Sequence, residues 1–230
     1  MTIYRTVSME SDMSLVFIQP KQPPQRLLTK VASKVINRRA VEVLPKPDMS
    51  TGRLIFRHLT RNDESQFIEA INHSRSLLRR WIPLNRERES DHRFFRRTMT
   101  RARVGDVQGT AWRRAAFIDD GPDEGRFVGL FNLIKIERGL EWTAEANWWV
   151  DDRLTGHGLA TEAVQGLLDM GFSDHPMGLG LHRIRAMICA DNPGSVRIAE
   201  KLGFTNTGIR DLLEINRALV THYEFERIAA

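Results

Sequence analysis

The sequence has few of the features that mark secreted, membrane and metal-binding proteins. Its single cysteine, Cys189, excludes an internal disulfide framework and a cysteine-rich zinc site. No apolar run approaches the roughly 20 residues that a membrane-spanning helix needs, and no secretory leader pattern opens the chain. The histidines, among them His73, His182 and His222, lack metal-ligand spacing. We therefore expect a cytoplasmic protein without membrane association or bound metal.

The charge is basic and diffuse. The 230 residues carry a formal net charge of +5, and 41% of them are hydrophobic, which is enough to bury a core. A basic balance suits an anionic partner such as a phosphate-bearing cofactor. Arginines are densest between Arg86 and Arg103, and we interpret them as a solvated helix face in preference to a binding patch. No array of alternating aromatic and basic residues points to RNA, so nucleic acid is not an expected partner.

The beginning of the chain differs from the rest in its proline content. Proline breaks helices and demotes strands to sheet edges, and five prolines lie in the first 48 residues: Pro20, Pro23, Pro24, Pro45 and Pro47. We expect residues 1–48 to form a poorly structured extension, apart from a short strand at residues 15–18 and a short basic helix at residues 27–39. Residues 49–230 would form the folded domain. Alternatively, the extension adds an edge strand or wraps a binding cleft.

Hydrophobic periodicity predicts the elements of the folded domain. Alternation predicts strands at residues 54–58, 112–118, 126–136, 142–150, 184–188, 204–209 and 219–228. A helix is expected after Thr60 or Asn62, and a second one after Ser90. Two more are expected at residues 158–172 and 195–202. The spacing of the strands from residue 112 to residue 150 indicates an antiparallel meander.

A strand-to-helix junction at residues 155–163 carries the most informative chemistry. It reads TGHGLATEA, and its two glycines let the backbone turn sharply and approach a ligand closely. The N–H groups at the start of the following helix, together with the helix dipole, form an anion site for which a pyrophosphate is the natural occupant. The alternative is a simple helix-capping turn.

Together with its flanks, this junction resembles the GNAT acetyltransferases, and more closely their RimJ/RimL-like branch. The strand before it reads AEANWWV from Ala144, and LHRI follows at residues 181–184. The segment DNPGSVRIAEKLGF at residues 191–204 and the segment LLRRWIP at residues 77–83 also resemble that branch. The resemblance covers roughly residues 53–228 and leaves out the extension.

The resemblance implies an α+β fold with a mostly antiparallel central sheet whose central strands splay apart and whose faces are flanked by helices. It implies acetyl-CoA as cosubstrate and direct transfer of the acetyl group to a primary amine. A protein N-terminal amine, of the ribosomal-protein-alanine type, is the expected acceptor. A small amine, an antibiotic or an aminoacyl nucleotide remains an alternative, as does a non-enzymatic acyl-CoA-binding regulator. The chain would act as a monomer or a homodimer.

The resemblance also implies the residues of the site. Glu145 would act as general base or be merely structural, and Ser195 would donate to the leaving sulfur or cap a helix. Asn192 would contact the pantetheine arm or serve as a turn residue, and His157 would touch a phosphate or remain solvated. Thr155 stands where the family usually has Gln or Arg. The implied cofactor-binding residues are Trp149, Val150, Thr155, Gly156, His157, Gly158, Leu159, Ala160, Thr161, Asn192 and Ser195.

Overall fold

The computed structural model describes residues 48–82 and 89–229. The strand and the basic helix expected at residues 15–18 and 27–39 lie outside the described residues. In the described part, no helix is long and apolar enough to cross a membrane. The predicted domain boundary after residue 48 stays a prediction.

In residues 48–82 and 89–229, eight strands form a single sheet in the order β1-β2-β3-β4-β5-β6-β8-β7. Among these strands only β5 and β6 pair in parallel, and every other neighbouring pair is antiparallel. The strands are β1 (Met49–Ser50), β2 (Leu54–Arg57), β3 (Trp112–Ile118), β4 (Phe127–Glu137), β5 (Thr143–Val150), β6 (Arg183–Cys189), β7 (Thr205–Ile215) and β8 (Ala218–Ile228). The predicted meander corresponds to β3, β4 and β5, and the α+β fold is confirmed.

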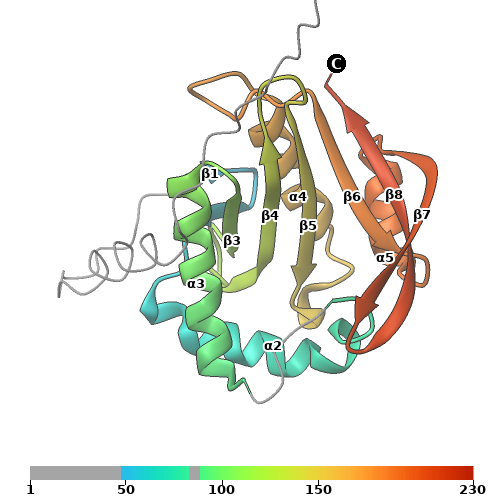
Figure 1. Cartoon of the computed structure of the whole chain (residues 1–230). Coiled ribbons are helices and arrows are strands. Elements are labelled where there is room, and N and C mark those ends of the chain that lie inside the picture. Colours follow the sequence, from blue (N-terminus) through green and yellow to red (C-terminus); the bar gives the residue numbers. More distant parts are fainter. Residues whose placement is uncertain (1–47, 83–88, 230) are drawn as a thin grey trace, which may run out of the picture. The chain divides into compact units, whose positions relative to one another are not determined.

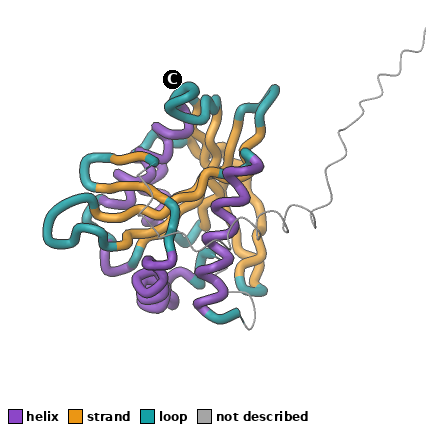
Figure 2. The backbone as a smooth tube through the Cα atoms, turned by 90° about the vertical axis from the view of Figure 1, so that its left-hand side faces the viewer, coloured by secondary structure: helices purple, strands orange, loops and turns teal. Residues whose placement is uncertain are grey.

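Helices cover both faces of the sheet (Figures 1 and 2). In Figure 1, α2 (Glu64–Leu78) runs below the lower ends of the strands, and α3 (Asp91–Gln108) lies in front of the sheet. Behind it lie α4 (Leu159–Phe172) and α5 (Pro193–Lys201). Short 3₁₀ turns, η1 (Arg61–Asp63) and η2 (Asp152–Leu154), precede α2 and follow β5. The predicted cap at Ser90 is confirmed, because its hydroxyl accepts from the N–H of Arg93.

The core is divided into two clusters by the sheet. On the α4 side, Val164 and Leu167 pack with Phe131 and Ile184. On the side of α2 and α3, Phe67 and Trp149 meet at a ring separation of 6.0 Å. Neighbouring residues of β5 alternate between these clusters, as they do in any strand. Trp148 and Trp149 therefore point to opposite faces of the sheet.

The central strands separate after a short paired stretch. β5 and β6 pair only at Thr143↔Arg183, Ala144↔Ile184 and Glu145↔Arg185. At the same level β4 contains an irregularity between Ile134 and Glu137, where Lys135 has a φ of 49°. Such bulges bend a strand and increase its local twist. Beyond this point β5 stays with β4 while β6 stays with β8, and Figure 1 shows β5 and β6 diverging.

Candidate functional site

A pocket lies where β5 and β6 separate. Its empty volume is about 390 Å³, part of it open to solvent. It is lined by Trp81, Ile82, Ala146, Asn147, Trp148, Ala186, Met187, Ile188, Cys189, Asn192, Ser195 and His222. The lining residues come from both splayed strands, from α5, from β8 and from the segment after α2, so five parts of the chain meet at one place.

The last part of β5 directs backbone groups into this gap. In an antiparallel pair, every second residue points its backbone groups toward the partner strand. The N–H of Asp151 donates to the carbonyl of Val128 at 2.8 Å, so the backbone groups of Trp149, two residues earlier, also point toward β4. The backbone groups of Trp148 and Val150 then point toward β6, which no longer pairs with β5 at this level. Trp149 and Val150 are the two β5 residues that the resemblance implies as cofactor-binding, and the backbone groups of Val150 are suitably oriented to bond a ligand in the gap. Those of Trp149 are not, because β4 uses them, and the Trp149 side chain is buried in the core.

The glycine-rich junction forms the turn that leads into α4. Gly156 and Gly158 have φ values of 80° and 79°, in the region that favours glycine, and Gly158 is the N-cap of the helix. The first intrahelical bond runs from Glu162 N–H to the carbonyl of Gly158, so the N–H groups before Glu162 point out of the helix end. His157 is exposed, whereas the Leu159 side chain is buried and offers only its backbone. This arrangement fits a pyrophosphate.

A side chain from the beginning of β2 adds positive charge to this turn. Arg53 donates to the carbonyl of His157 at 3.2 Å and to the Glu162 carboxylate at 2.7 Å. Thr51 donates to the same carboxylate at 2.6 Å. Burial alone would raise the pKa of Glu162, but the hydrogen bonds from Thr51 and Arg53 outweigh it and the pKa is lowered. Glu162 therefore holds the Arg53 guanidinium beside the turn.

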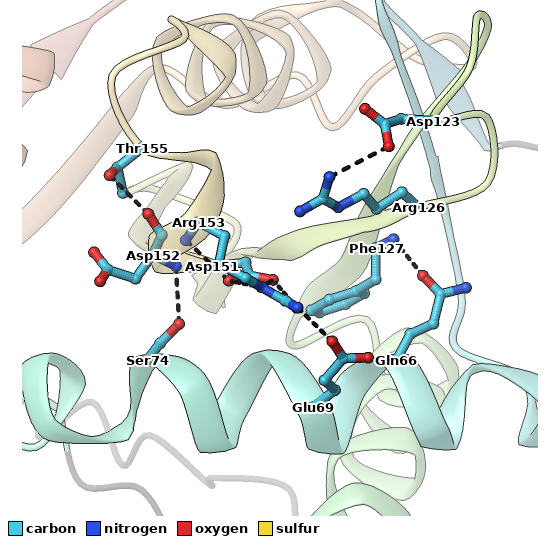
Figure 3. Close-up of polar contacts among 10 residues, drawn as sticks. All are labelled: Gln66, Glu69, Ser74, Asp123, Arg126, Phe127, Asp151, Asp152, Arg153 and Thr155. Atoms are coloured by element: carbon cyan, nitrogen blue, oxygen red, sulfur yellow. Dashed lines mark hydrogen bonds and ion pairs between the residues drawn. The ribbon is translucent and has the colours of Figure 1, made fainter.

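α2 supports the turn from the other side (Figure 3). The buried Ser74 hydroxyl accepts from the N–H of Asp152 at 2.8 Å, and Arg153 bridges Asp151 and Glu69. Those two carboxylates raise the pKa of Arg153, with Asp151 contributing most. Thr155 donates its hydroxyl to the carbonyl of Asp152 at 2.8 Å. The side chain of Thr155 thus orders the loop itself, and any contact with a cofactor would come from its backbone.

The beginning of α5 separates the roles of two predicted residues. Asn192 is the N-cap, because its Oδ1 accepts from the N–H of Ser195 at 3.1 Å. Proline at the first helical position, Pro193, fits this boundary. Ser195 is therefore not the cap that one reading of the sequence expected. Ser195 and Asn192 both line the pocket, where the fold brings them together.

Three residues of the pocket lining carry buried polar groups. The indole N–H groups of Trp81 and Trp148 are buried and have no hydrogen-bond partner in the described part of the chain. A buried donor without a partner costs about 1–3 kcal/mol, so each one calls for an explanation. His222 is buried at 3% exposure, and its Nδ1 lies 2.9 Å from the carbonyl of Val220. Since a carbonyl can only accept, Nδ1 carries the proton, and Nε2 is the acceptor of the neutral ring.

Glu145 lies at the point where β5 and β6 stop pairing. Its carboxylate forms an ion pair with Lys135 at 2.6 Å, and its side chain is 25% exposed. It shares a face of β5 with Asn147, which lines the pocket, but is itself absent from the lining. Its role as general base stays a prediction.

Sequence reasoning missed Arg53, Trp81 and His222. Arg53 reaches Glu162 across 109 residues, and no local pattern predicts such a contact. Trp81 had one usable signal, its place in the segment that resembles the RimJ/RimL-like branch. His222 was considered only as a metal ligand.

The comparisons with known proteins agree with this geometry. The model of the acetyltransferase (GNAT) domain matches residues 53–205, more than half of the chain. The chain therefore belongs to the GNAT acetyltransferase family. A curated relative is a probable N-acetyltransferase, YjcK of Bacillus subtilis, 37% identical over 100 residues, which are 43% of this chain and 53% of that protein. This chain thus spans about half the length of that relative.

Solved structures share the fold. RimJ of Mycobacterium smegmatis, in complex with CoA-disulfide, superimposes with a TM-score of 0.67 at 21% identity, covering 80% of this chain and 90% of that one. A ribosomal-protein-alanine acetyltransferase from Vibrio fischeri gives a TM-score of 0.66 at 20% identity, covering 78% and 95%. At these identities the likeness establishes the fold.

Proposed function

We propose that this chain is an acetyl-CoA-dependent N-acetyltransferase whose acceptor is a protein N-terminal amine. The observation that carries the proposal is the pocket at the splay of β5 and β6, whose lining brings together Ser195, His222 and two tryptophans, Trp81 and Trp148, without an Asp, Glu, Lys or Arg among the described residues. Membership of the GNAT family supports the acetyl transfer, and the names of the structural neighbours favour this kind of acceptor.

The chain's own residues supply what the cosubstrate needs. The turn from Thr155 to Thr161 would hold the pyrophosphate through backbone N–H groups, with Arg53 beside it. Val150 and Trp148 would bond the amides of the pantetheine arm as a neighbouring strand would, and Asn192 would lie beside the arm at the beginning of α5. When bound, acetyl-CoA supplies a thioester whose acetyl group an amine can attack.

Two side chains of the pocket can move the protons of this reaction. His222 Nε2 would accept a proton from the attacking amine, because the bond from Nδ1 to Val220 fixes the tautomer that leaves Nε2 basic. The Ser195 hydroxyl would donate to the leaving sulfur. Glu145 remains the rival base, but its carboxylate is engaged in an ion pair with Lys135, and Glu145 is absent from the lining of the pocket.

The lining also bears on the class of acceptor. It contains no carboxylate among the described residues, so it offers no counter-charge for a polyamine or a cationic antibiotic. It also contains no Lys or Arg to hold the phosphate of a nucleotide. The apolar wall and the two indole donors suit a small uncharged side chain and peptide carbonyls.

Coenzyme A release from acetyl-CoA with a panel of amines tests the proposal. Peptides beginning with Ala or Ser should be acetylated, and the same peptides with a blocked N-terminus provide the matched control. A panel in which polyamines or aminoglycosides are the better acceptors would replace the peptide assignment. Binding of acetyl-CoA without release from any amine would favour a regulator over an enzyme.

A further inference from the structure

The edge strand β7 is open along its outer side. It is the last strand in the sheet order, and it pairs only with β8 in the described part of the chain. Its residues from Thr205 to Leu212 are exposed, and Ile209 and Leu212 are each 55% exposed. A long exposed edge with apolar side chains is a template for pairing with another strand.

The hairpin determines which backbone groups face outward. Asn216 and Arg217 have φ values of 51° and 70°, which is the two-residue type I′ turn. In such a hairpin the flanking pair Ile215↔Ala218 exchanges both hydrogen bonds, and alternate residues along the strand do the same. The N–H and C=O groups of Arg210, Leu212 and Glu214 therefore point away from β8.

Charge selects one register for pairing this edge with a second copy of itself. With a two-fold axis at Leu212, each Arg210 lies opposite the other copy's Glu214, Leu212 lies opposite Leu212, and the outward groups of all three residues meet. An axis at Arg210 or Glu214 would place like charges opposite each other, and an axis at Asp211 would oppose two aspartates. An axis at Ile209 or Leu213 would leave both Arg210 and Glu214 without an opposite charge across the interface. Within the described residues neither Arg210 nor Glu214 has an ion-pair partner.

We propose that two copies of this chain pair antiparallel through β7 around a two-fold axis at Leu212, which joins their sheets into one. The interface is isologous, so each attractive charge pair occurs twice. The charges that would otherwise protect an edge against association are arranged here to be complementary under the two-fold axis. The proposal goes beyond the proposed function and does not depend on the chemistry of the pocket.

Charge reversal in the full chain tests both the interface and its register. Sedimentation velocity over a concentration series should give a species of twice the 26.5 kDa chain mass. Arg210→Glu alone and Glu214→Arg alone should each raise the dimer dissociation constant at least about 10-fold, or about 1.4 kcal/mol. The double variant, Arg210→Glu with Glu214→Arg, should restore the native dissociation constant. Arg103→Glu, an equal charge change at an exposed position of α3, should leave it unchanged.

Three results would overturn the proposal. A native chain that sediments as a monomer throughout would leave the edge to another partner or to residues 1–47. A dimer that neither single reversal weakens would place the interface elsewhere. Single reversals that weaken the dimer without rescue by the double variant would refute the register at Leu212. All the exchanged side chains are exposed, and circular dichroism verifies that each variant is folded.

Discussion

The two sides of the pocket are built differently. The proposed cofactor side comes mostly from one stretch of chain, β5 through α5, with Arg53 added from just before β2, and relies on backbone N–H groups, glycines and helix ends. The proposed acceptor side brings Trp81, after α2, together with His222 on β8, and relies on particular side chains. The cofactor side should therefore tolerate side-chain changes that leave the backbone in place, whereas single side-chain changes on the acceptor side should alter the chemistry.

The largest expected effect is on the acceptor side. His222→Gln keeps a hydrogen-bonding side chain but removes the basic nitrogen, so kcat should fall roughly 100-fold while the Kd for acetyl-CoA stays near native. The deficit should shrink at high pH, where the amine is already deprotonated. Steady-state kinetics with a peptide acceptor and calorimetry measure the two quantities.

Glu145→Gln is the matched control for His222→Gln. If Glu145→Gln lowers kcat roughly 100-fold and His222→Gln does not, the base is Glu145 and the role proposed for His222 is wrong. If both do, the two groups act through a common proton path.

On the cofactor side, Gly158→Asp should raise the Kd for acetyl-CoA at least about 10-fold, or about 1.4 kcal/mol. The φ of 79° strains any residue other than glycine, and the carboxylate would repel the pyrophosphate. Gly158→Ala is the control, because it introduces the strain without the charge. The difference between the two Kd values, measured by calorimetry, isolates the electrostatic part. Equal affinities would mean that no phosphate lies at this turn.

This contrast also explains what could be predicted from the sequence. The strand–glycine–helix junction and the Ser90 cap are local, so a pattern of a few residues specifies them. The full pairing of β7, from Thr205 to Ile215, was predicted too short, because Gly208 interrupts the alternation at a bulge. Arg53 and His222 reach their positions through sheet pairing across most of the chain. The cap at Asn192 could have been found, since Pro193 at the first helical position identifies the residue before it.

Ser195 and Asn192 test whether two neighbouring residues divide chemistry and structure between them. Ser195→Ala should lower kcat only several-fold, because the thiolate of coenzyme A leaves readily, and it should leave stability unchanged. Asn192→Ala should cost about 1 kcal/mol of unfolding free energy by removing the cap. Thermal melts and kcat for both variants decide the matter, and a loss of stability in Ser195→Ala would contradict this division.

The support of the turn before α4 has a defined pH dependence. The folded-state pKa of Glu162 is lowered from 4.5, so its stabilising contribution is fully present above that value and is lost as the pH falls through the folded-state pKa. Glu162→Gln should cost about 1 kcal/mol near neutral pH and progressively less in acid. Urea unfolding at several pH values measures this. A cost that does not change with pH would mean that packing, not charge, is what Glu162 contributes.

The smallest effect is expected from deleting residues 1–47. The described part of the chain begins with Asp48, whose N–H donates to the carbonyl of Phe56 at 2.8 Å and whose carboxylate pairs with the buried Arg114. A deletion that keeps Asp48 should lower Tm by less than about 5 °C. Deleting residues 1–50 is the control that should cost more, because it also removes β1 and Met49, which packs against α4 at Gly166. A fall in Tm of more than about 5 °C on deleting residues 1–47 would make the extension part of the fold. A native Tm and native acetyl-CoA affinity, combined with lost turnover of peptides, would instead assign the extension to the acceptor side of the pocket.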